Sequence, residues 1–191
     1  MPPFDSINEL YFPATGADAH AAGPSEIERE VMGHFEQFRD PLLRYALSFG
    51  IRMHDAEEVI QEVFLALFRH LQLGRSRKNL RGWIFRVTHN LALKQRYANN
   101  GLRTTMNAGE ANMHEQSDPS PNPEEHLSNA QRRQRLLAVV NALGEAEQHC
   151  LRLRAEGLRY REIAEVLGIS LGSVSVLLAR SMERLIRADG R

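Results

Sequence analysis

The sequence has a single cysteine, Cys150, among its 191 residues. An intramolecular disulfide therefore cannot form, and a zinc site built from several cysteines is excluded. Because Cys150 lies in the apolar-rich run 150–153, we expect a buried thiol that serves packing. No apolar run approaches the roughly 18 residues that a membrane span requires, and residues 1–24 lack the basic and apolar regions of a signal peptide. We therefore expect a cytoplasmic protein with no membrane insertion.

Acidic residues are missing from one long stretch in the middle of the chain. No Asp or Glu occurs between Val63 and Gly109, although the whole chain balances 24 Lys and Arg against 24 Asp and Glu. The basic residues of this stretch are Arg69, Arg75, Arg77, Lys78, Arg81, Arg86, Lys94, Arg96 and Arg103. Such a segment favours a polyanion partner, nucleic acid above all, over an ordinary solvated surface.

Apolar residues recur at helical spacing through most of the chain, which predicts an all-α protein. Ser25 and Glu28 have the spacing of a capping box, so the first helix is expected to begin there. Pro41 predicts a kink in this helix or two abutting helices. Asp55 is expected to cap the next helix.

The composition divides the chain into four parts. Residues 1–24 are read as a flexible tail and 25–97 as a small helical domain, whose last helix covers Leu80–Tyr97 and is broken by the Asn-Asn-Gly sequence at 99–101. Residues 98–127, rich in Asn, Gly, Ser and Pro, are expected to form a flexible linker, and 128–191 a second helical domain. The acidic end of the linker is either a solvated spacer or a shield for a basic surface.

The stretch Tyr160–Leu185 has the pattern of two helices joined by a tight turn. Gly168 is suited to the left-handed conformation that ends the first helix, and Ser170 is placed to cap the second. Ala164 with Gly168 would permit a close crossing of the two helices. The pattern favours a helix-turn-helix whose second helix enters a DNA major groove; an αα-hairpin of an ordinary bundle is the alternative.

Aromatic side chains are interleaved with the basic residues of the Leu80–Tyr97 helix. Trp83 and Phe85 are suited either to stacking on unpaired bases or to packing in the core. The eight histidines are scattered, and no His, Asp or Glu cluster has the spacing of metal ligands. We therefore expect no enzyme, no metal and no cofactor.

These motifs together resemble the extracytoplasmic-function (ECF) group of bacterial RNA polymerase sigma factors. DAEEVIQEVFLALFRHL at 55–71 is similar to the helix with which that family binds core polymerase. NLRGWIFRVTHNLALKQRY at 79–97 is similar to its minus-ten element helix, and the segment 151–185 to its minus-thirty-five reader. The resemblance implies a sigma factor that binds core RNA polymerase, through the largest-subunit coiled coil and the flap, and directs promoter recognition and transcription initiation.

The resemblance also assigns residues to each contact. It implies that core polymerase is bound by Asp55, Glu58, Gln61 and Glu62. It implies that the minus-ten element is bound by Arg77, Lys78, Trp83, Arg86, Asn90, Lys94 and Arg96. It implies that the minus-thirty-five element is bound by Arg161, Ser170, Ser173, Ser175, Val176, Arg180 and Arg184.

The chain departs from the family pattern at three of its positions. Lys94 stands where the family usually has Asp, and Ser175 and Leu177 stand where it usually has basic residues. The apolar pair Val176 and Leu177 is suited either to thymine methyl groups or to a protein partner. Two alternatives therefore stay open: a DNA-binding regulator that acts without core polymerase, and a sequestering interaction protein. An anti-sigma factor is a further partner that the family allows.

Overall fold

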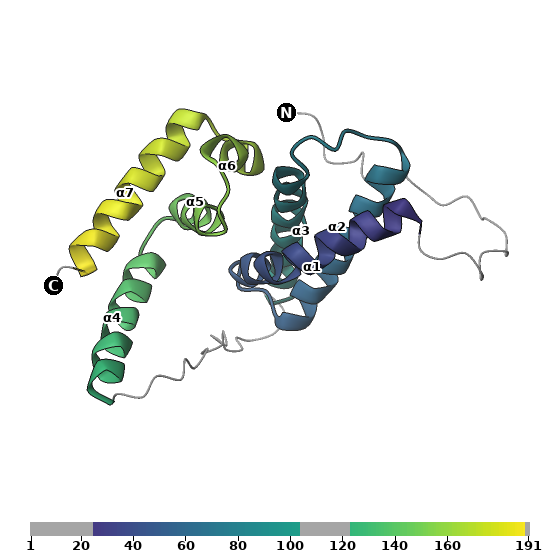
Figure 1. Cartoon of the computed structure of the whole chain (residues 1–191). Helices are drawn as coiled ribbons and strands as arrows, with labels where there is room; N and C mark the ends of the chain where they lie inside the picture. Colours follow the sequence, from purple (N-terminus) through teal and green to yellow (C-terminus); the bar gives the residue numbers. More distant parts are fainter. Residues whose placement is uncertain (1–24, 104–122, 190–191) are drawn as a thin grey trace.

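The helices of the chain gather into two groups, which Figure 1 shows side by side. The computed structural model describes residues 25–103 and 123–189. The first group, which we call the first module, contains α1 (Glu26–Leu47), α2 (Met53–Gln72) and α3 (Leu80–Arg103). The second module contains α4 (Pro123–Asn141), α5 (Glu145–Ala155), α6 (Tyr160–Leu167) and α7 (Leu171–Asp189).

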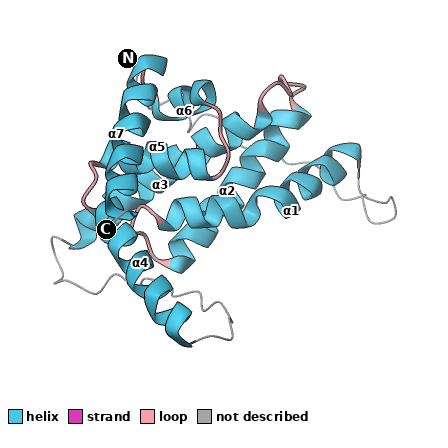
Figure 2. Ribbon diagram, turned by 60° about the vertical axis from the view of Figure 1, so that its left-hand side comes forward, coloured by secondary structure: helices cyan, strands magenta, loops and turns pink. Residues whose placement is uncertain are grey.

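The predicted all-α class is confirmed, since these described ranges contain helices and loops and no strand (Figure 2). The predicted tail at 1–24 and the centre of the predicted linker, 104–122, lie outside the described residues. Within the described ranges no single helix has the length and hydropathy of a membrane span. The pair α6–α7 reaches that composition only when both helices are counted together, across a bend of 106°.

The start of α1 follows the predicted capping box. The Ser25 hydroxyl accepts from the Glu28 backbone N–H at 3.2 Å, and the Glu28 carboxylate accepts from the Ser25 backbone N–H at 2.5 Å. Pro41 lies inside this helix, which continues to Leu47. Of the two alternatives at Pro41, two abutting helices are therefore excluded and a kink within one helix is left. The predicted helix start is confirmed.

The helix α3 is longer than the sequence predicts. The helix continues through Asn99, Asn100 and Gly101 to Arg103, six residues beyond the predicted end at Tyr97. The side-chain amide of Asn99 donates a hydrogen bond to Asp55 of α2 at 2.9 Å. Helix propensity describes only local preferences and does not include such a tertiary contact. The helix α4 also begins before the predicted domain boundary at 128. The division into a linker and two domains at 97 and 127 stays a prediction.

The helix-turn-helix has the predicted local geometry. Gly168 ends α6 with a left-handed φ of 66°, and the Ser170 hydroxyl accepts from the Ser173 backbone N–H at 3.0 Å at the start of α7. A Cβ at Gly168 would meet no atom within 4 Å. The glycine is thus required for its backbone conformation, and the expectation that it permits close helix crossing is wrong.

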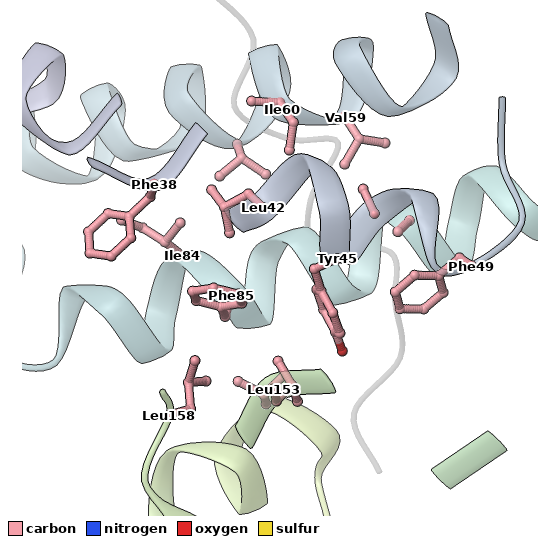
Figure 3. Packing of buried hydrophobic residues seen from close by; sticks show 14 of the residues in the cluster. Phe38, Leu42, Tyr45, Phe49, Val59, Ile60, Ile84, Phe85, Leu153 and Leu158 are labelled. Carbon is pink, nitrogen blue, oxygen red and sulfur yellow. The ribbon is translucent and has the colours of Figure 1, made fainter. Parts of the chain in front are cut away.

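One hydrophobic core extends through both modules. Leu153 of α5 and Leu158 in the turn before α6 point toward Phe85 of α3 and Tyr45 of α1 (Figure 3). All four side chains are at most 2% exposed. Cys150, fully buried in the same core, is the packing thiol that was predicted, and burial raises its pKa to about 11.

Candidate nucleic-acid interface

The acidic flank of α2 is exposed over three of its four predicted residues. Glu58, Gln61 and Glu62 are exposed on the helix, whose other side packs Val59, Val63 and Leu67 into the core. The helix therefore separates an apolar face, which fixes its position, from a polar face available to a partner.

Asp55 does not belong to this flank. The helix begins at Met53 with Arg52 as its N-cap residue, so the prediction that Asp55 caps it is wrong. Asp55 is 4% exposed and accepts from Arg52 Nε at 3.1 Å and from Asn99 at 2.9 Å. Burial alone would raise the pKa of the carboxyl, but these hydrogen bonds outweigh it and lower the pKa. Asp55 ties α2 to α3 and is a structural residue.

The basic face of α3 is open at three of the predicted positions. Arg86, Asn90 and Lys94 are exposed and follow one another at intervals of four residues, which places them along one side of the helix. Lys78 is exposed in the loop before α3. Arg77 of the same loop is paired with Glu30 of α1 at 3.1 Å.

The aromatic residues of α3 are divided between the core and the surface. Phe85 is 1% exposed, so of the two alternatives, stacking on bases and packing in the core, it does the second. Trp83 is half-buried against the core, and its ring lies 4.5 Å from that of His70. Tyr97 is 64% exposed under the Arg96 guanidinium, which leaves its ring as the accessible flat surface of this helix.

The second module covers another side of the same basic segment. Arg96 forms an ion pair with Glu145 of α5 at 2.5 Å, and Arg81 donates to the Glu156 carbonyl. Asn79 donates to the Glu165 carboxylate of α6 at 3.2 Å. Of these α3-side groups, Arg96 was predicted to bind DNA, yet it is only 23% exposed and held by a carboxylate. The sequence did not predict these three contacts, because the two residues of each are separated by about 50 to 90 positions.

The helix-turn-helix presents a mixed surface of polar and apolar residues. Arg161, Ser173, Ser175 and Arg180 are exposed, and Val176 is 50% exposed among them. Leu177, in contrast, packs against the core. Ser170 is engaged in capping α7, and Arg184 lies 3.6 Å from Glu147. At the start of α7, Leu171 is 51% exposed, whereas Val174 and Leu178 are buried.

The described part of the chain offers no cluster of three or more His, Cys, Asp or Glu side chains that could hold a metal ion. The site presents exposed cations on α3 and α7, the exposed amide of Asn90 on α3, and exposed acids on α2. Such groups bind phosphates, bases and a basic protein surface respectively.

Each of the two modules matches a known protein family. Residues 34–100 match sigma-70 region 2, and residues 133–185 match sigma-70 region 4. The sequence is 30% identical over 175 residues to the ECF RNA polymerase sigma factor SigE of Mycolicibacterium smegmatis; the match covers 91% of this chain and 64% of that protein. It is 26% identical over 172 residues to the ECF RNA polymerase sigma-E factor of Escherichia coli, covering 83% of this chain and 90% of that one.

Two solved structures share the fold. RpoE of Bartonella quintana, in complex with the anti-sigma factor NepR, matches with a TM-score of 0.63 and 17% identity over 84% of this chain and 96% of that chain. CnrH, in complex with the cytosolic domain of CnrY, matches with a TM-score of 0.55 and 21% identity over 83% and 86%.

The structural role of Asp55 leads to a prediction. We expect Asp55→Ala to lower the free energy of unfolding by about 1–3 kcal/mol, because Arg52 and Asn99 lose a buried acceptor. Glu62→Ala, on the exposed flank of the same helix, is the matched control and should change it by less than about 0.5 kcal/mol. Urea unfolding measures both. Equal stabilities of the two variants would contradict the structural role.

Proposed function

The chain belongs to the ECF group of bacterial RNA polymerase sigma factors, and we propose that it binds core RNA polymerase, directs it to two-part promoters and helps to open them. The observation that carries the proposal is the order of the two family matches along one chain, in which most of the predicted residues are exposed. The protein acts by binding, with no catalytic residue and no cofactor, in the cytoplasm where the bacterial polymerase works.

Core polymerase is bound, in this proposal, by the exposed flank of α2. Glu58, Gln61 and Glu62 face the basic coiled coil of the largest subunit, while the second module reaches the flap. Charged groups at such a contact set its register and its association rate more than its final affinity. Asp55 is left out of the contact because it is buried.

The promoter is bound in two places. Arg86, Asn90 and Lys94 of α3 hold the non-template strand of the minus-ten element, the cations on phosphates and the amide on a base edge. The exposed residues of α7, with Ser175, Val176 and Arg180 at its start and centre, lie in the major groove of the minus-thirty-five element. Because both modules belong to one chain, binding of one raises the effective concentration of the other.

An anti-sigma factor is proposed as a regulatory partner. Support comes from the solved relatives, of which one was captured with the anti-sigma factor NepR and the other with the cytosolic domain of CnrY. The 50% exposed Val176 would also suit a protein partner, which is the observation that favours a sequestering protein as the second candidate. Leu177 no longer supports that candidate, because it packs against the core.

Run-off transcription tests the proposal directly. Core polymerase with this chain should give a promoter-dependent transcript that core polymerase alone does not give. A sequestering protein would give no transcript on any promoter. A regulator that acts without the polymerase would shift promoter duplex by itself and recover no polymerase subunit in a pull-down. Either result would overturn the proposal.

The α2 flank gives a second prediction. Glu62→Arg reverses one exposed charge opposite a basic surface, and we expect it to weaken core binding about tenfold, or about 1.4 kcal/mol. Fluorescence titration of core polymerase without DNA measures the affinity. Glu36→Arg, an equal charge reversal on the exposed side of α1, is the control and should bind core as the unsubstituted chain does. Unchanged affinity of Glu62→Arg would exclude this flank.

The α3 face gives a third prediction. Arg86→Ala combined with Lys94→Ala removes two exposed cations, and we expect the slope of promoter affinity against salt concentration to fall by about two, with at least a tenfold loss of opened promoter at physiological salt. Permanganate reactivity of unpaired thymines measures opening. Core affinity should stay unchanged. Arg39→Ala, an exposed arginine on α1, is the control for loss of charge as such. Normal opening by the double variant would make this face a solvated surface only.

A further inference from the structure

We propose that His89 and His149 form a pH-sensitive latch between the two modules. The two neutral rings add to the stability of the contact between the modules, and protonation of the rings weakens that contact. This inference goes beyond the proposed function, and only its consequence for access of DNA to α3 rests on that function.

The two histidines meet in an aromatic cluster that spans the modules. His149 of α5 stacks on Phe49, just after α1, with 4.5 Å between ring centroids, and lies edge-on to His89 of α3 at 5.3 Å. Tyr45 of α1 lies 6.1 Å from His149 and 6.2 Å from His89. The exposed fractions of the two histidines are 8% for His89 and 5% for His149. The cluster is therefore almost dry, and each module supplies part of its rings.

The hydrogen bonds of the cluster suit neutral rings. His89 Nδ1 lies 2.8 Å from the Tyr45 hydroxyl, and a neutral imidazole can accept the hydroxyl proton there. Burial keeps the pKa of Tyr45 far above its ordinary value, so the hydroxyl stays a donor. His149 Nδ1 is buried and has no hydrogen-bond partner among the residues that the structure describes. Protonation would turn His89 Nδ1 into a donor, so the Tyr45 hydroxyl would have to rotate and accept. It would also place a charged N–H at His149 Nδ1, which has no acceptor among the described residues.

The charged groups around the cluster do not compensate for the cost of protonating the two buried rings. Burial lowers the pKa of His149, and the cations Arg152 and Arg96 lower it further, while Glu145 acts in the opposite direction. Burial and His149 lower the pKa of His89 to about 4, again against Glu145. The Glu145 carboxylate lies 3.4 Å from His149 Nε2, but it is already paired with Arg96 at 2.5 Å. The remaining titratable neighbour, Cys150, stays a neutral thiol because burial raises its pKa.

These shifts give the direction of the pH effect. Both histidines have a lower pKa in the closed contact than the ordinary value of 6.5, so the open form binds more protons. The stability that the neutral rings give to the closed contact is therefore fully present above about pH 6.5 and decreases as the pH falls toward 4. His89 alone would raise the opening constant by up to about thirtyfold between pH 7.5 and 5.0.

Opening of the latch changes what α3 presents. The ion pair of Arg96 with Glu145 crosses the same contact, and so does the hydrogen bond from Arg152 to the Ser48 carbonyl at 3.1 Å. Separation of the modules frees Arg96 beside the exposed Lys94. Mild acidification would thus enlarge the basic surface that the proposed function assigns to the promoter.

Single-molecule energy transfer within the full chain tests the latch without polymerase or DNA. Dyes are placed on Met32→Cys in α1 and Ile186→Cys in α7, both exposed, in a Cys150→Ala background whose folding is checked by circular dichroism. We expect the high-transfer population to dominate at pH 7.5 and the ratio of open to closed molecules to rise at least tenfold at pH 5.0. A population that does not change between these pH values would overturn the latch.

Two variants separate the histidines from a general acid effect. His89→Phe with His149→Phe keeps the rings and removes the titration, so its high-transfer population should persist at pH 5.0. His54→Gln, which removes an exposed histidine of α2, should respond as the unsubstituted chain does. A pH response that survives in the Phe variant, or is lost in His54→Gln, would overturn the proposal. So would NMR titration of the unsubstituted chain that shows both buried histidines titrating at about 6.5 while transfer stays high.

Discussion

The contact of Leu153 and Leu158 with Phe85 and Tyr45 is the constraint on which the arrangement of the molecule depends. Each buried leucine contributes about 1.5–3 kcal/mol relative to an exposed one. Helices α1 and α2 cover one side of α3, and this contact with the second module covers another side of it. Only the strip between these two sides is left to a ligand, and Arg86, Asn90 and Lys94 lie on it.

Polar groups at the edge of this contact fix how the modules meet. The Glu156 side chain accepts from Arg44 of α1 at 3.0 and 3.2 Å, and its backbone carbonyl accepts from Arg81 of α3. The next residue, Gly157, has a φ of 84°, and a Cβ there would lie 3.0 Å from Arg81. Arg44 is 59% exposed, so its ion pair is screened by solvent and sets register more than stability.

Local features were predictable because their causes are local. The capping box at Ser25, the left-handed Gly168 and the cap at Ser170 each depend on residues within four positions of one another. The errors have a tertiary cause. Asp55 looks like an N-cap in sequence, but Asn99, 44 residues away, makes it a buried acceptor. Asn99 makes this hydrogen bond from the Asn-Asn-Gly sequence through which α3 continues, although low helix propensity would favour an end there in an isolated helix.

The contact between the modules could not be predicted from local sequence patterns. One feature of the sequence is related to it, the uneven distribution of the acidic residues. A chain with no net charge and an acid-free basic segment must carry its acids elsewhere, and nothing in the pattern says where they lie in space. In the structure Glu145, Glu156 and Glu165 of the second module face the start and end of α3 and the end of α1. Carboxylates and phosphates compete for the same cations, and Arg96 cannot serve both at once. In the closed molecule the second module therefore occupies, with its carboxylates, part of the surface that a polyanion would use.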